Sequence, residues 1–202
     1  MKYNSITYAM SQEQELFNAI TMIFPTILLA YKACTYSNYW IKILFISCLI
    51  HLAVSLIYHI NVAYDNYEDR IDNNIRRLDQ TLQIIIGTII TFALFGCWQY
   101  TLCAIIINLI GIYYIWNNET SNNGDCWKCI LLCVILYTSP ILLQRKYYNY
   151  LITIGSIIIG GLCFIPEINT KYFKGWGHSI MHLFTFIHIQ SLINYMQTYK
   201  IK

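Results

Sequence analysis

Charged residues are scarce in this chain. Only 11% of its 202 residues are Asp, Glu, Lys or Arg, against about 25% in a typical soluble domain, and 57% are hydrophobic. This balance excludes an ordinary soluble domain and indicates an integral, multi-pass membrane protein.

Other features are missing as well. No run of Lys or Arg is present, so the sequence lacks the basic patch with which proteins bind nucleic acid or anionic lipid. No spacing repeats at a fixed period, and no break suggests a second domain, so we expect one membrane domain over 1–202. The first 15 residues hold one Lys against two Glu, and no small-residue cleavage site follows the first apolar run. That run is therefore expected to be a span and not a cleavable signal peptide.

Seven apolar stretches are long enough to cross a bilayer, which takes about 20 helical residues each. We therefore expect an all-α fold, a polytopic bundle of seven transmembrane helices. Pro25 is expected to kink the first helix, and the short link between the third and fourth predicts an antiparallel hairpin. The expected spans are 16–31, 40–63, 78–95, 98–116, 127–143, 148–165 and 176–196.

Five polar side chains lie within or at the ends of these stretches. Polar and ionisable residues are costly inside a bilayer, and by default they mark function. Ser55 and His59 come near the end of the second span, Asp79 opens the third, and His178 and His182 open the last. Counting spans puts all five in one leaflet, on the membrane face that carries the N-terminus.

The spacing of these residues indicates a metal site. Ser55 and His59 are four residues apart, as are His178 and His182, so each pair shares one helix face. An i, i+4 histidine pair on one helix is a recurrent zinc chelate. Three imidazoles can hold zinc while a nearby carboxylate handles a water, so convergence of the five would predict an enzyme.

Three short motifs carry a resemblance to a known superfamily. They are Ser-Leu-Ile-Tyr-His at 55–59, Leu-Asp at 78–79, and Gly-His-Ser-Ile-Met-His-Leu at 177–183. In this order and on these spans they resemble the seven-span superfamily that includes alkaline ceramidases, progestin and adipoQ receptors and hemolysin III-like proteins. The gap between His59 and Asp79 is more similar to the receptor and hemolysin III side than to the ceramidases.

The resemblance implies a Zn²⁺ ion held by His59, His178 and His182. Asp79 would bind or activate the zinc-bound water, which is the expected nucleophile, and Ser55 would stabilise an oxyanion or orient that water. The implied substrates are membrane lipids with amide or ester bonds, such as ceramides. Two other classes stay open: a non-catalytic seven-span receptor that keeps the zinc for structure or sensing, and a membrane scaffold without metal.

Each residue also has a plainer interpretation. The histidines could be interfacial side chains, Ser55 could bond its own helix, and Asp79 could cap its helix or form a surface ion pair. His51 and His188 are expected to be structural, although paired histidines across helices would also suit a membrane haem.

Further signals in the sequence depend on which side of the membrane they face. The 13 Lys and Arg residues divide nearly evenly between the two expected faces, so the positive-inside rule gives no orientation. A Cys-x-x-Cys at Cys126 and Cys129, and a glycosylation sequon at 118–120, would be used only on an extracytoplasmic face.

Overall fold

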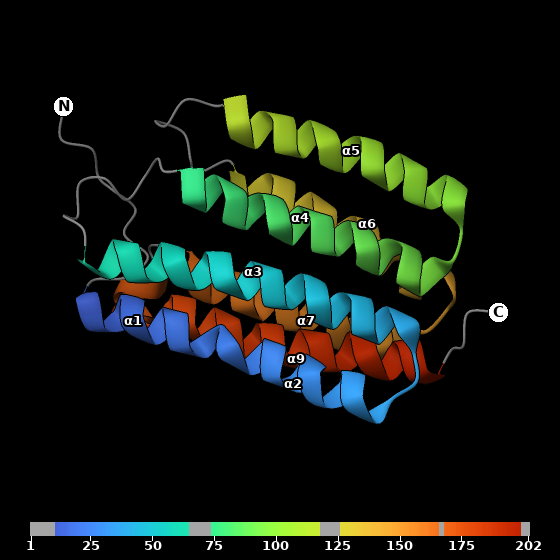
Figure 1. Cartoon of the computed structure of the whole chain (residues 1–202), viewed down its shortest axis with the longest axis horizontal. Helices are drawn as coiled ribbons and strands as arrows, with labels where there is room; N and C mark the ends of the chain where they lie inside the picture. Colours follow the sequence, from blue (N-terminus) through green and yellow to red (C-terminus); the bar gives the residue numbers. More distant parts are fainter. Residues whose placement is uncertain (1–10, 65–73, 118–125, 166–167, 199–202) are drawn as a thin grey trace.

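A computed structural model describes residues 11–64, 74–117, 126–165 and 168–198. Within these ranges every regular element is helical, and the long helices run roughly parallel or antiparallel to one another (Figure 1). The predicted all-α fold is therefore confirmed. The elements are α1 (Gln12–Thr21), α2 (Ile23–Thr35), α3 (Tyr39–Tyr64), α4 (Asn74–Phe95), α5 (Trp98–Asn117), α6 (Cys126–Leu143), α7 (Tyr147–Phe164), the short π-helix η3 (Asn169–Phe173) and α9 (Gly177–Thr198).

The first apolar stretch forms a broken helix that starts earlier than its hydropathy indicates. Ser11 caps α1 by accepting a hydrogen bond from the backbone N–H of Gln14, and α1 ends at Thr21. The break at Met22 has a direct cause in Pro25, which lacks an N–H and crowds the carbonyl four residues earlier, that of Thr21. α2 then continues from Ile23 in the same general direction (Figure 1).

Four segments are long and apolar enough to cross a membrane. They are Gln12–Thr35, Tyr39–Tyr64, Asn74–Phe95 and Trp98–Asn117. α6 and α7 contribute shorter apolar helices, Lys128–Leu143 and Tyr147–Cys163. α9 has 22 residues but includes His, Ser, Gln and Asn side chains, several of them buried, which lower its hydropathy. By length and composition, then, four of the seven expected spans qualify within the described residues.

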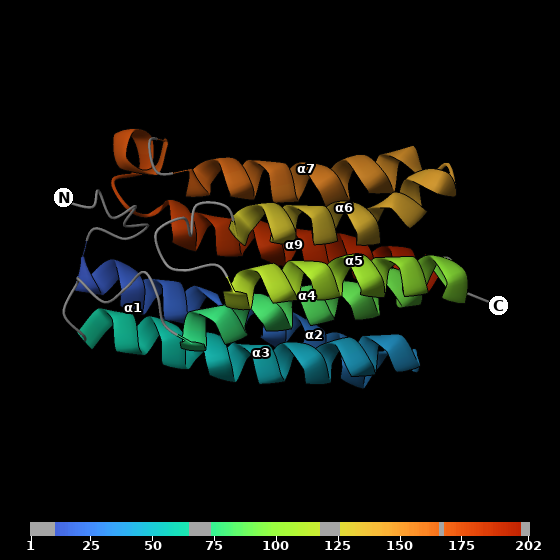
Figure 2. The ribbon, with the colours of Figure 1, turned by 90° about the horizontal axis from the view of Figure 1, so that it is seen from above.

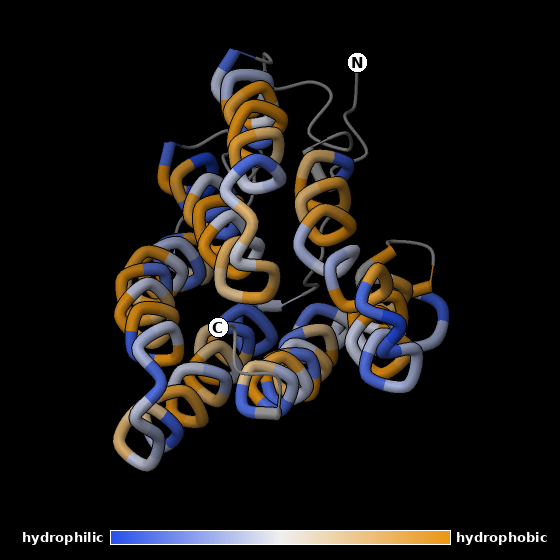
Figure 3. Tube along the Cα trace, turned by 90° about the vertical axis from the view of Figure 1, so that its right-hand side faces the viewer, coloured by the Kyte–Doolittle hydropathy of each residue, from blue (hydrophilic) through white to orange (hydrophobic). Residues whose placement is uncertain are grey.

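The helices surround a shared interior, and α5 lies at the edge of the group. α4 packs against α3, α5 and α6, while α9 packs against α7, α2 and α1. α5 contacts α4 and α6; it lies along the upper edge of the bundle in Figure 1, and in Figure 2, seen from above, it lies in front of α4. Hydrophobic residues recur along all of the helices in the end-on view (Figure 3).

The outer surface of α5 shows the consequence of this position. Leu102, Ile106, Leu109 and Ile110 all leave close to half or more of their surface exposed. A soluble monomer seldom leaves so many large apolar side chains in water. The bundle is consistent with a membrane protein whose outer side chains face lipid.

Helix contacts inside the bundle rely on close approach as well as on apolar bulk. Gly87 of α4 lies against α6, where an added Cβ would overlap the Sγ atom of Cys133 and press on the ring of Tyr137. Small residues allow helices in a membrane to approach closely, where packing replaces the hydrophobic effect as the source of association. The interior includes Leu29, Leu44 and Leu192, all essentially inaccessible.

Candidate metal centre

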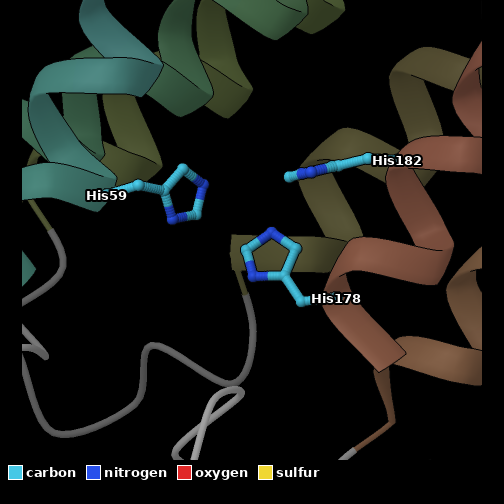
Figure 4. Close-up of side chains that lie close together, drawn as sticks. All are labelled: His59, His178 and His182. Atoms are coloured by element: carbon cyan, nitrogen blue, oxygen red, sulfur yellow. The ribbon is translucent and has the colours of Figure 1, made fainter. Parts of the chain in front are cut away.

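Three histidines converge at one end of the bundle. His59 comes from the last part of α3, and His178 and His182 come from the first turns of α9. One candidate ligand atom from each lies within 4.8 Å of the other two. Their rings point toward one another across the space between the two helices (Figure 4).

The ring geometry describes a compact group. The ring centroids of His59 and His178 are 4.9 Å apart, those of His59 and His182 are 5.8 Å apart, and those of His178 and His182 are 4.6 Å apart. His59 is 2% exposed and His182 is 3% exposed, so neither is an interfacial side chain that reaches water. Three imidazoles so close together suit a metal ion that binds nitrogen ligands.

Hydrogen bonds select the tautomer of two of the three rings. Nδ1 of His59 lies 2.8 Å from Oε2 of Glu15, which as a carboxylate can only accept. Nδ1 of His182 lies 3.1 Å from the backbone carbonyl of Asn18, another acceptor, and 2.9 Å from the hydroxyl of Thr21. These partners assign the proton to both Nδ1 atoms, and in the neutral imidazoles that a metal binds, both Nε2 atoms then keep a lone pair.

His178 is held differently from the other two rings. Its Nδ1 lies 3.3 Å from Nδ2 of Asn18, a longer contact that leaves its tautomer undetermined. Asn18 also donates to Oε2 of Glu15 at 3.2 Å and accepts from the Ser179 hydroxyl. The buried amide of Asn18 therefore contacts His178 directly and His59 through Glu15.

One face of α1 supplies a row of partners to the histidines. Glu15, Asn18 and Thr21 are spaced three residues apart and are all buried. Partners of this kind orient metal-binding imidazoles and raise their basicity. A buried carboxylate, a buried amide and a buried hydroxyl on a short membrane helix are costly unless such partners compensate them.

Glycines set the start of α9, and with it the position of His178. A Cβ at Gly177 would overlap the carbonyl oxygen of Cys163, and the Gly177 N–H donates to Oδ1 of Asn169 at 2.8 Å. Gly175 has a φ of +93°, a conformation that side chains other than hydrogen rarely adopt. Gln14 of α1 donates to the carbonyl of Lys174 at 2.7 Å, so α1 holds this turn too.

Asp79 lies in a second polar cluster beside the first. It is the sixth residue of α4 and 8% exposed, so it neither caps the helix nor forms a surface ion pair. Its Oδ2 accepts from Nε2 of Gln83 at 3.0 Å, and its Oδ1 lies 3.0 Å from Nε2 of His51. Ser55 and His59, both on α3, also interact with this carboxylate.

His188 is enclosed in a separate network deeper in the bundle. Its Nε2 lies 2.7 Å from the hydroxyl of Tyr137, and its Nδ1 lies 2.9 Å from the carbonyl of Thr153. Both ring nitrogens therefore have protein partners, as expected of a structural histidine. The side chain of Cys126 and residues 118–120 lie outside the described part of the chain.

Sequence reasoning missed Glu15, Asn18, Thr21 and the pairing of His51 with Asp79. A signal for the first three was present, because a Glu-x-x-Asn-x-x-Thr pattern at 15–21 puts three polar groups on one face of a helix. The expected first span began at Leu16, where the apolar run begins, and so excluded Glu15. Nothing in one sequence predicts the cross-helix contact of His51.

Comparisons of the chain with protein-family models, with curated proteins and with solved structures each found no match.

Proposed function

We propose that this chain is an integral membrane, zinc-dependent hydrolase that cleaves amide or ester bonds of lipids, with ceramide-like molecules as substrates. The observation that carries the proposal is the convergence of His59, His178 and His182, the first and last of them buried and each with its Nδ1 facing an acceptor oxygen. We include in the proposal that all seven apolar segments cross the bilayer, because α6, α7 and α9 run alongside the four longer helices (Figure 1).

The donor set fits zinc. Catalytic zinc sites use three protein ligands and leave a further position open, and three neutral imidazoles form such a set. Glu15 and the Asn18 carbonyl supply the outer partners that these ligands usually have. When bound, zinc would acidify a water and polarise a carbonyl group, which is the chemistry that hydrolysis of an amide or ester requires.

Asp79 and Ser55 would transfer the proton and orient the water. Asp79 would take a proton from the attacking water as the new carbon–oxygen bond forms, and would return it to the amine or alcohol as the old bond breaks. Ser55, which interacts with the same carboxylate, would help to orient that water. Glu15 is less suited to be the base, because its Oε2 is already bonded to His59 and Asn18.

The surroundings support a lipid substrate over a soluble one. The histidine group lies among helices with apolar outer surfaces, and His59 and His182 are almost inaccessible to water. A substrate would therefore need to place its scissile carbonyl within the bundle while its chains remain in an apolar environment. Lipid amides and esters have this combination of a polar centre and long apolar chains.

Two measurements on detergent-purified protein test the proposal. We expect about one equivalent of zinc per chain, and release of fatty acid from at least one member of a panel of ceramides and ester lipids. Asp79→Asn should keep the zinc and lower turnover by about 10²- to 10⁴-fold, the usual contribution of a positioned base.

Gln80→Glu serves as a control. It changes the charge of a buried residue next to Asp79 on α4, and so tests whether turnover depends on which position is changed and not only on the change of charge. Folded protein without zinc would contradict the metal site. Zinc-loaded protein with no turnover on any lipid would favour a seven-span receptor that uses the metal for structure or sensing.

A further inference from the structure

The contact between His51 and Asp79 joins α3 to α4 next to the proposed metal centre. Nε2 of His51 and Oδ1 of Asp79 are 3.0 Å apart, and the two side chains are about one tenth exposed. His51 lies eight residues before His59 on α3, and it does not belong to the three-histidine group. Its role must therefore be sought in its effect on Asp79.

These two atoms have no other polar partner in the described part of the chain. Both are buried, and neither makes a hydrogen bond of good geometry, although they lie close enough for one. A short approach between poorly aligned groups leaves each of them incompletely satisfied, which is costly in a buried setting. The contact is therefore a close approach of a buried donor and a buried acceptor, each of which has the other as its nearest candidate partner.

The carboxylate of Asp79 is contacted on both oxygens. Gln83 donates to Oδ2 at 3.0 Å from the next turn of the same helix, and His51 faces Oδ1 from the neighbouring helix. A carboxylate has about four acceptor positions, so these two contacts leave lone pairs for a water. Together they would fix the plane of the carboxylate relative to the metal centre.

We propose that His51 is a positioning residue for Asp79, which rests on the proposed hydrolytic function. A general base must hold its lone pair on the proton that it removes, and this depends on groups that lock its rotamer. His51 would do so by donating its Nε2–H to Oδ1 of Asp79. In the described part of the chain no hydrogen bond joins it to His59, His178 or His182, and in this assignment it does not touch the reacting atoms.

Turnover of four variants tests the proposal: His51→Leu, His51→Gln, Asp79→Asn, and Asp79→Asn combined with His51→Leu. We expect His51→Leu to keep one equivalent of zinc, lower kcat by about 10- to 100-fold and leave KM unchanged. His51→Gln, which retains a donor at a similar distance, should recover most of the rate. In the Asp79→Asn background, His51→Leu should cause no further loss, because its effect passes through Asp79.

Three results would overturn the role of His51. They are turnover of His51→Leu within twofold of the parent, an equal loss in both backgrounds, and loss of zinc or of folded protein in both His51 variants. The last result would make His51 a structural residue. Leu substitution at His188, which is also buried but has its contacts away from Asp79, provides the matched control and should leave kcat unchanged.

A spectroscopic reading separates this proposal from the one on which it rests. If the parent protein binds metal but turns over no lipid, the proposed function fails. The absorption spectrum of the cobalt-substituted protein then tests His51 alone. His51→Leu should reproduce the spectral change that Asp79→Asn causes, and an unchanged spectrum in His51→Leu would overturn the positioning role.

Discussion

His182 and His188 lie six residues apart on α9, and each is 3% exposed, yet their surroundings differ in kind. Both nitrogens of His188 have partners within the protein, the hydroxyl of Tyr137 and the carbonyl of Thr153. The hydrogen bonds of His182 within the described residues run through Nδ1, to Asn18 and Thr21, and its ring lies beside two more histidines. Burial alone therefore does not distinguish a candidate metal ligand from a structural histidine; the difference between these two lies in how many ring nitrogens are satisfied by the protein.

The largest expected effect is on metal binding. His182→Ala should abolish zinc binding, because two imidazoles remain where three are needed. His188→Ala should keep one equivalent of zinc, since that ring lies outside the group. Metal analysis of both variants after gel filtration measures the contrast, and equal zinc contents in the two proteins would contradict it.

Removing the charge of Glu15 should have the next largest effect. Glu15→Gln keeps the shape of the side chain but weakens the acceptor for Nδ1 of His59, so zinc affinity should fall by about 10- to 100-fold. Competition with a chelator measures the affinity. Glu13→Gln is the matched control, because Glu13 is on the same helix and exposed to the outside; the same loss in both variants would point to a general charge effect.

His188→Phe should change stability and not metal binding. The variant leaves the hydroxyl of Tyr137 without its partner and removes one donor to the carbonyl of Thr153, which still accepts from the Ser156 hydroxyl. Hydrogen bonds between membrane helices are worth about 0.6 kcal/mol on average and up to about 1.7 kcal/mol. Unfolding in mixed detergent should thus show a loss of about 1 kcal/mol, with zinc content unchanged. A loss of zinc would show that the His188 network and the three-histidine group are coupled, contrary to their separation in the structure.

The smallest effect is expected at Thr21. Thr21→Val removes one of two acceptors for Nδ1 of His182, while the carbonyl of Asn18 remains. One interhelical hydrogen bond of about 0.6 kcal/mol corresponds to roughly a threefold change in zinc affinity. An effect as large as that of Glu15→Gln would show that the hydroxyl, and not the carbonyl, holds the ring.

Hydropathy gave the helices, because a membrane segment must satisfy its backbone internally and be apolar outside. It located their ends less well, and for a physical reason. α1 starts at Gln12 and α4 at Asn74, each four residues before the expected span, since a cap or a turn of polar residues can extend a helix beyond its apolar run. Glu15 lies in that polar extension.

His178 and His182 could be named from the sequence because their spacing on α9 follows the helix period, and His59 because it lies four residues after Ser55 near the end of an apolar span. Their partners could not be named, because pairing depends on which helices become neighbours. Asn18 meets Ser179 and His178 across more than 150 residues of chain, and His51 meets Asp79 across an interhelical contact. Such contacts depend on how the helices pack, and they leave no periodic pattern in the sequence.

The contacts of α1 with α9 bear on how the protein assembles. Asn18 and Thr21 bond side chains about 160 positions further along the chain, so this part of the site cannot form until the last helix has entered the bundle. Contacts at such separation form late, because a long loop must close before they contribute. A metal ion that binds only this closed arrangement would stabilise the assembled bundle against opening. The metal supply would then govern the lifetime of the protein in the membrane.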